Sequence, residues 1–377
     1  MKASKKSNSQ KAKKKTFTAI DLFAGAGGFS LAALLSGIEV RAAVESDRHA
    51  SKTYQTNLIE RLKAKTALFE KDIRAIDWSL VLKKANLRKG ECDLLLGGPP
   101  CQGFSTHRLK GAGVDDPRNE LLGSYFDSVE AIRPAAFLIE NVPGLLWKRH
   151  ETYLEKLLAA AKAAKYTVFL PVVLNARSYG APQNRKRVFI LGFREDISVK
   201  VSWPPPVSHF SPTDEAVKCG DRRAWLTAAM VFAKPFLPDD ANDLHMQHSA
   251  EMIQVFKSTP SNGGSRHESN RVLSCHLEHN GHKDVYGRID PNRPGPTMTT
   301  ACINPSKGRF LHPTKNHGIC LRHAARFQTF PDDFVFGGGI IAAGRQIGNA
   351  VPITLGVALI EAIKLALKSS TKSSSRR

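Results

Sequence analysis

Residues 18–30 read Thr-Ala-Ile-Asp-Leu-Phe-Ala-Gly-Ala-Gly-Gly-Phe-Ser, an apolar run followed by closely spaced glycines. Residues 18–23 predict a strand, and residues 29–35 predict a helix. Glycines between a strand and a helix let the backbone approach a ligand closely, as at nucleotide sites. The spacing is not GxGxxG, so a tight structural turn is the competing interpretation.

The alternation of short apolar runs and helical patterns continues along the first half of the chain. Further strands are predicted at 39–44, 92–96, 136–139, 168–174 and 188–192, and further helices at 47–58, 121–132 and 153–164. This alternation predicts an α/β fold, a doubly wound and mostly parallel sheet with helices on both faces. After residue 193 the chain becomes rich in proline, histidine, glycine and serine, which predicts a smaller irregular domain over 196–310. An apolar helical pattern returns over 345–368.

The formal charge of +21 is unevenly distributed. Residues 1–15 carry seven lysines and residues 368–377 carry four basic residues, neither with an acid, so the body retains +10. A basic body suits a protein that neutralises backbone phosphates, and the tails would add attraction independent of sequence. Solvated disorder of 1–15 and 369–377 without a specific task is the alternative.

Six cysteines are scattered without a CxxC pair, and neither a signal peptide nor a window of about eighteen unbroken apolar residues is present. We therefore expect a soluble, cytoplasmic protein with reduced thiols. The chain has thirteen histidines, and His245, His248, His276, His279 and His282 lie in the irregular domain beside Cys275. Their spacings do not form a standard zinc finger, so we expect no metal.

Acidic residues follow two of the predicted strands. Glu45 ends the second strand, a little over twenty residues after the first, where an acid can hydrogen-bond a ribose hydroxyl pair. Asp72 follows a third short strand, in a position to meet an adenine. Either residue alone would be an ordinary helix cap, but the series indicates an adenosine-containing ligand.

A candidate nucleophile follows the strand at 92–96. The chain continues as Gly-Gly-Pro-Pro-Cys-Gln-Gly-Phe-Ser over 97–105, which places Cys101 on a loop beyond the carboxyl edge of the sheet. The next strand brings Glu140 to the same edge, beside the thiolate. A third cluster, Gln-Asn-Arg-Lys-Arg over 183–187, suits phosphate or carboxylate binding, with a solvated basic edge as the alternative.

Taken together and in order, these motifs resemble the cytosine carbon-5 DNA methyltransferase family of the bacterial restriction-modification type. The resemblance covers residues 16–195 and about 285–365, including Arg-Phe-Gln-Thr-Phe-Pro at 326–331 and Gly-Asn-Ala-Val-Pro at 348–352. It implies a Rossmann-like S-adenosylmethionine-dependent fold with a catalytic and cofactor-binding domain over 16–195 and 311–368. The irregular domain at 196–310 would then recognise the target sequence.

The resemblance also assigns site residues and partners. The implied catalytic residues are Cys101, Glu140, Arg185 and Arg187. The implied ligands of S-adenosylmethionine are Asp21, Phe23, Gly25, Gly27, Gly28, Glu45, Asp72, Ile73, Pro100 and Asn349. The implied substrate-binding residues are Gln102, Ser105, Asn141, Val142 and Gln183. The expected partner is double-stranded DNA. The protein is expected to act as a monomer at the nucleoid, without binding a membrane, and to be paired functionally with a restriction endonuclease.

In the implied reaction, Cys101 adds to carbon 6 of a flipped-out cytosine while Glu140 stabilises the charge on the ring. Two alternatives remain, a transfer RNA cytosine-5 methyltransferase and a catalytically weak relative that only binds DNA. The long recognition region favours DNA over RNA, and the intact catalytic motifs oppose the weak relative. His317 and His323 stand where relatives commonly carry arginine and glutamate, and Ser46 stands where an aromatic residue often stacks on adenine.

Overall fold

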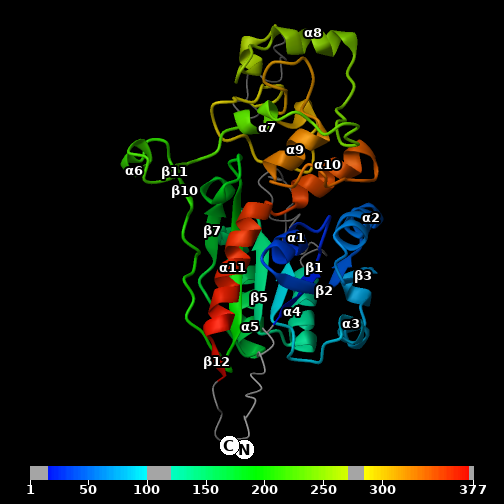
Figure 1. Cartoon of the computed structure of the whole chain (residues 1–377), viewed down its shortest axis with the longest axis vertical. Coiled ribbons are helices and arrows are strands. Elements are labelled where there is room, and N and C mark those ends of the chain that lie inside the picture. The colour runs from blue at the N-terminus through cyan, green and yellow to red at the C-terminus, as the bar shows by residue number, and fades with distance from the viewer. Residues whose placement is uncertain (1–15, 100–119, 271–283, 373–377) are drawn as a thin grey trace, which may run out of the picture.

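One mixed sheet forms the centre of the protein. The computed structural model describes residues 16–99, 120–270 and 284–372, and Figure 1 shows their arrangement. The main sheet has the order β3-β2-β1-β4-β5-β8-β6, with β7 paired to β8. Its strands are β1 (Phe17–Leu22), β2 (Ile38–Glu45), β3 (Ala67–Glu70), β4 (Leu94–Gly97), β5 (Ala136–Asn141), β6 (Tyr166–Val168), β7 (Val172–Asn175) and β8 (Lys186–Arg194). Strands β1 to β5 pair in parallel and β8 runs antiparallel to β5, which confirms the predicted α/β fold.

Helices cover both faces of this sheet because each strand alternates its side chains between two apolar cores. In β1, Ala19 belongs to the core under α1 (Gly28–Leu35) and α11 (Ile353–Ser369). Its neighbour Ile20 belongs to the core under α3 (Trp78–Ala85), α4 (Glu120–Ile132) and α5 (Glu151–Ala163). In β4, Leu95 faces this second core while the leucines on either side face the first. This period of two is the pattern expected for a strand buried on both faces.

Several predicted elements have different bounds in the structure. The predicted helix at 47–58 is α2 (Arg48–Tyr54), continued by a π-helix, η1 (Gln55–Arg61). The strand predicted at 168–174 was wrong, because β6 and β7 are separate strands joined through an exposed Leu170 and Pro171, whose ring nitrogen cannot donate to a ladder. The helix predicted at 345–368 is two helices, α10 (Gly339–Asn349) and α11, and Pro352 precedes the second. Short 3-10 turns are η2 (Ile73–Ala75), η4 (Pro143–Leu146), η5 (Lys148–His150) and η6 (Ala176–Tyr179).

The chain after β8 is irregular, as its composition predicts, and the domain boundaries themselves stay a prediction. Its elements are β9 (Ile197–Ser198), β10 (His209–Phe210), α6 (Glu215–Lys218), β11 (Arg223–Ala224), α7 (Ala229–Ala233), α8 (Ala250–Ser258), η7 (Arg266–Glu268) and η9 (Pro305–Lys307), followed by α9 (Leu321–Phe327). Near the end of the chain, β12 (Thr371–Lys372) pairs with β9. Figure 1 shows α8 at one end of the long axis.

A fully buried arginine organises this irregular part. The Arg288 guanidinium donates to the backbone carbonyls of Phe256 at 2.6 Å, Thr259 at 2.9 Å and His312 at 2.9 Å. These acceptors belong to the end of α8 and to the segment before α9. Five donors in a fixed plane allow arginine to satisfy several carbonyls at once, so one side chain holds two segments together.

One helical stretch in the described ranges has the length and composition of a membrane-crossing helix. It is Gly339–Ser369, with a mean hydropathy of 1.9 in its most apolar window. More than half of that window, 56%, is buried inside the protein, and α11 packs against α1. These properties are those of a core helix, so the stretch is weak evidence for a membrane span.

Candidate active site

The carboxyl edge of the parallel strands brings the glycine loop and Glu45 together. The Gly25 N–H donates to Glu45 Oε2 at 2.7 Å, and the Asp47 N–H donates to Oε1 at 2.8 Å. Burial raises the pKa of the Glu45 carboxyl, and these backbone hydrogen bonds oppose the rise. The residue after the first strand and the residue at the end of the second are therefore in direct contact, as their positions at neighbouring strand ends predict.

The glycine loop needs residues without a side chain. Gly25 and Gly27 have φ values of 56° and 93°, and Gly27 caps the N-terminus of α1. A Cβ at Gly27 would lie 2.4 Å from Leu58 Cδ1, so this glycine lets η1 pack against the loop. A Cβ at Gly25 would meet nothing within 4 Å. The loop is thus packed on one side and open on the other.

Beneath the loop, a buried chain of hydroxyl groups leads to Asp21. The Tyr54 hydroxyl donates to Ser30 Oγ at 2.8 Å, and the Ser30 hydroxyl donates to Asp21 Oδ2 at 2.7 Å. Burial raises the pKa of Asp21 to about 7, although the hydrogen bonds from Ser30 lower it. Asp21 was predicted from the sequence, but Ser30 and Tyr54 were not, because ordinary helical positions give no signal of this contact.

Asp72 follows β3 at the same edge, as predicted, but its carboxylate is hydrogen-bonded to Arg74. It caps η2 through the Arg74 N–H at 2.9 Å, and the Arg74 guanidinium contacts both oxygens, at 3.0 Å and 2.6 Å. These bonds lower the pKa of Asp72 to about 2. Ile73 beside it is buried, whereas Ser46 on the neighbouring loop is exposed.

Glu140 and Arg187 form a nearly buried ion pair at the ends of β5 and β8. Arg187 Nε lies 2.9 Å from Glu140 Oε1, and the two side chains are 14% and 11% exposed. Within the described ranges, Glu140 Oε1 accepts no aligned hydrogen bond, so it retains a lone pair for another donor. Burial lowers the pKa of Arg187, and Glu140 counteracts this by favouring the charged guanidinium. The structure thus brings together two residues that the sequence placed 47 positions apart.

The strand that carries Glu140 also contacts the segment that leads to the predicted nucleophile. The Asn141 side-chain amide donates to the Pro99 carbonyl at 3.4 Å, and the Val142 N–H donates to Asn141 Oδ1 at 2.7 Å. A Cβ on Gly98 would lie 3.3 Å from Glu140 Oε2. The described chain therefore approaches Glu140 closely just before residue 100. Four predicted site residues, Pro100, Cys101, Gln102 and Ser105, lie outside the described residues.

Two predicted site residues are buried and bound to the protein backbone. The Arg185 guanidinium donates to the carbonyls of Met298 at 2.7 Å and Gly348 at 2.9 Å. The Gln183 amide donates to the Phe327 carbonyl and to Gln328 Oε1, each at 2.6 Å, and accepts from the Met298 N–H at 3.1 Å. These side chains join β8 to three later segments of the chain. Their predicted catalytic and substrate-binding roles stay predictions.

The segment at the end of α10, late in the sequence, packs against the glycine loop. A Cβ on Gly28 would lie 3.2 Å from the Val351 carbonyl, and one on Gly348 would lie 2.2 Å from the Thr299 carbonyl. Asn349, a predicted cofactor ligand, is exposed between these two contacts. The segment 348–351 therefore lies against the glycine loop.

The two unusual histidines pack in a cluster of rings. His317 stacks on His245 with the ring centroids 4.0 Å apart, and His323 is buried with its Nδ1 3.2 Å from Cys320 Sγ. Burial and neighbouring positive charge lower the pKa of His323 to about 2, so the ring is neutral. No group of three potential metal ligands exists among the described residues, and Cys275, His276, His279 and His282 lie outside them.

A mostly parallel sheet that presents a glycine loop, two strand-end carboxylates and a nearly buried Glu–Arg pair at one edge is the architecture of an α/β enzyme. Comparison with known proteins identifies the family. The family model for C-5 cytosine-specific DNA methylases matches residues 17–365, so the chain belongs to this family and is a DNA cytosine methyltransferase.

The individual relatives agree with this assignment. The chain is 32% identical over 355 residues to Type II methyltransferase M1.HphI of Haemophilus parahaemolyticus, covering 92% of this chain and 87% of the relative. It is 32% identical over 356 residues to M.MthTI of Methanothermobacter thermautotrophicus, covering 92% and 96%. A solved DNA modification methyltransferase encoded within an E. coli prophage has a TM-score of 0.71 at 23% identity, covering 94% and 100%, and supports the fold.

Proposed function

We propose that this chain methylates carbon 5 of a cytosine flipped out of duplex DNA, with S-adenosylmethionine as donor and Cys101 as the covalent nucleophile. The observation that carries the proposal is the Glu140–Arg187 pair, which lies at the carboxyl edge beside the segment leading to Cys101. The Glu140 carboxylate is nearly buried and keeps a free lone pair, so it is suited to hydrogen-bond the ring edge of a nucleobase.

The residues at the glycine loop fit S-adenosylmethionine. The loop is open above Gly25, and the half-buried Glu45 carboxylate lies directly beside it, where it can accept from ribose hydroxyls. Asp72 lies at the next strand end for the adenine, provided that it exchanges part of its contact with Arg74. When bound, S-adenosylmethionine supplies an electrophilic methyl group on sulfur. The site residues bind and orient it, with Phe23, Gly27, Gly28, Ile73, Pro100 and Asn349 completing the proposed contacts.

Carbon 5 of cytosine is a weak nucleophile, so the ring must be activated first. The Cys101 thiolate adds to carbon 6, and the electron pair moves onto the ring toward carbon 5. Glu140 contacts ring nitrogen 3 and the exocyclic amine and stabilises the charge that develops there. After carbon 5 has accepted the methyl group, loss of its proton returns an electron pair to the ring, and Cys101 leaves as the thiolate.

Arg187 and Arg185 serve different parts of this site. Arg187 holds Glu140 in place and is the candidate to hold the carbonyl oxygen of the base. Arg185 and Gln183 are anchored to Met298, so we assign them to positioning the catalytic edge against the recognition region. Asn141 and Val142 hold the segment before Cys101, and Gln102 and Ser105 are proposed contacts to the DNA.

We further propose that the enzyme acts as a monomer in the cytoplasm, at the nucleoid, and belongs to a restriction-modification system with a paired endonuclease. The similarity to relatives named Type II methyltransferases supports this context. The irregular region at 196–310 would read the target sequence through the major groove.

Covalent trapping tests the nucleophile and the target atom together. Fluorine at carbon 5 cannot depart as a cation in the way that the proton does, so the bond to the cysteine cannot be released by elimination. Duplex DNA with 5-fluorocytosine at a mapped target site should therefore form a denaturant-stable complex when S-adenosylmethionine is present. The linked peptide should contain Cys101, and Glu140→Gln should slow the trapping. A linkage through any other cysteine, or the lack of a complex with active enzyme, would show that the assigned site is wrong.

A further inference from the structure

Exposed lysines gather at the amino edge of the sheet, opposite the active site. Strands β1 to β5 begin at this edge, and α3, α5 and α11 end there. Figure 1 shows the ends of α5 and α11 at the end of the long axis opposite α8. We call the following residues, all exposed, the amino-edge lysines: Lys83, Lys84, Lys89, Lys162, Lys165 and Lys368.

Two arginines fix the turns that carry several of these lysines. Arg194 Nη1 donates to the carbonyls of Gly90 at 3.3 Å and Arg133 at 2.6 Å. Arg133 Nη1 in turn donates to the Ala164 carbonyl at 3.4 Å. The turns before β4, β5 and β6 are therefore held together, and their lysines project from one connected platform.

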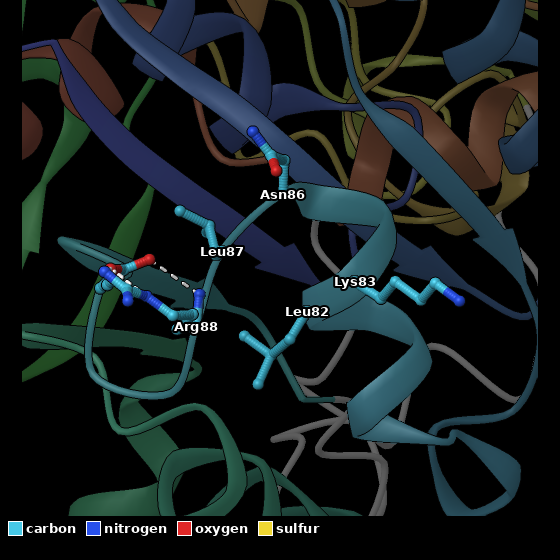
Figure 2. Close-up of a pocket in the computed structure, with 6 residues that line it drawn as sticks. Leu82, Lys83, Asn86, Leu87 and Arg88 are labelled. Atoms are coloured by element: carbon cyan, nitrogen blue, oxygen red, sulfur yellow. Dashed lines mark hydrogen bonds and ion pairs between the residues drawn. The ribbon is translucent and has the colours of Figure 1, made fainter.

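The region beside α3 shows how charge is distributed at this edge. Figure 2 shows a surface hollow lined by Leu82, Lys83, Asn86, Leu87, Arg88 and Glu91. Arg88 Nε donates to Glu91 Oε1 at 2.7 Å, so this pair is neutral. The Lys83 side chain points away from the pair and keeps its charge free for a partner.

The positive charge of the amino-edge lysines is larger than the nearby acidic residues and helix ends neutralise. Among the described residues, none of the amino-edge lysines has a carboxylate partner, and against the exposed Glu130 and Glu195 at this edge the excess is four charges. Each helix C-terminus contributes about half a negative charge, so the ends of α3, α4, α5 and α11 offset only about two of them. Residues 1–15, which precede β1 in the sequence, carry seven further lysines.

We propose that the amino edge is a second binding surface for duplex DNA, which holds a segment other than the one being methylated. A six-residue strand is about 20 Å long, so the sheet separates this edge from the active site by at least that depth. Because DNA stays straight over about 150 base pairs, one short duplex cannot bend around to reach both edges. DNA is also the polyanion that this enzyme already binds, and a second segment of it is always near.

A bridging experiment tests this surface. The proposed surface rests on the proposed function only in taking DNA as the polyanion. Methyl transfer to genomic DNA is therefore measured separately in the same preparations. A short duplex is immobilised and loaded with enzyme, and the capture of a second, fluorescent duplex is recorded against salt concentration. The edge variant carries Lys89→Gln and Lys165→Gln. The control variant carries Lys52→Gln and Lys156→Gln, which remove the same charge from exposed sites outside the amino edge and outside residues 196–310.

Wild type and the control variant should capture the second duplex, and the edge variant should capture it weakly while methyl transfer is unchanged. The slope of log affinity against log salt should fall by about 1.8 in magnitude, because each of the two lost phosphate contacts contributes about 0.9. Undiminished capture by the edge variant would overturn the proposal. Capture that rises with the square of the enzyme concentration would also overturn the proposal, because two enzyme molecules would then join the duplexes. The proposal would fail as well if deleting residues 1–15 were the only change that abolished capture. Loss of methyl transfer in wild type would count against the proposed function instead.

Discussion

The buried carboxyl of Asp21 makes the stability of the enzyme depend on pH. Its pKa is raised from 3.8 to about 7, with burial as the main cause. Between these values the folded protein holds a proton that the unfolded chain has released, so stability falls as the pH rises and levels off above pH 7. Asp21→Asn keeps the shape and an acceptor for the Ser30 hydroxyl but cannot ionise.

The size of the effect follows from the two pKa values. Each pKa unit corresponds to about 1.4 kcal/mol, so the ionised carboxyl costs the folded state about 4 kcal/mol above pH 7. About 1.7 kcal/mol of this cost is already present at pH 5. The Asn variant should therefore gain about 2.5 kcal/mol relative to wild type between pH 5 and pH 8.

Urea unfolding of both proteins at pH 5, 6, 7 and 8 measures this difference directly. Ser30→Ala provides a second variant, because it removes a hydrogen bond that lowers the pKa of Asp21, and its stability should keep falling above pH 7. A stability difference between wild type and Asp21→Asn that is the same at pH 5 and pH 8 would refute the account of a buried, titrating carboxyl.

Three further changes test other parts of the structure. Gly27→Ala should destabilise the protein by more than about 1 kcal/mol and weaken S-adenosylmethionine binding measured by calorimetry, because φ is 93° and the new Cβ would meet Leu58. Gly37→Ala controls for backbone strain alone, because Gly37 has a φ of 68° but open space around it. Cys101→Ser should abolish methyl transfer while DNA binding survives, and wild-type turnover would rule out the covalent mechanism. Deleting residues 1–15 should reduce the salt dependence of DNA affinity without changing which sequence is methylated, as methylation mapping would show.

The sequence predicts those features of the fold and site that depend on local pattern. Strand ends at Glu45 and Glu140 follow from apolar runs, and the parallel sheet then places both residues at one edge. Contacts between distant segments leave no such trace. Nothing in the residues around Gln183 indicates that its amide is bound by Phe327 and Met298, more than a hundred positions later.

Local breaks were also missed where one residue overrides a continuous pattern. The apolar character of residues 345–368 is unbroken enough to predict one helix, yet the missing N–H of Pro352 divides it. The break turns the chain so that Val351 lies against Gly28 of the glycine loop. The predicted strand at 168–174 failed in the same way at Pro171.

The packing of α11 on α1 sets an order of events during protein synthesis. Lys364 Nζ donates to the Ser36 carbonyl across a sequence separation of 328 residues. At a synthesis rate of about 5 to 20 residues per second, the ribosome takes roughly 15 to 65 seconds to make the chain between them. During that time α1 can pack against β1 and β2 but lacks α11, and the glycine loop lacks the support of Val351. A nascent chain therefore has a long period in which it can aggregate or recruit a chaperone, and the glycine loop reaches its final packing only after residues 348–369 have been synthesised.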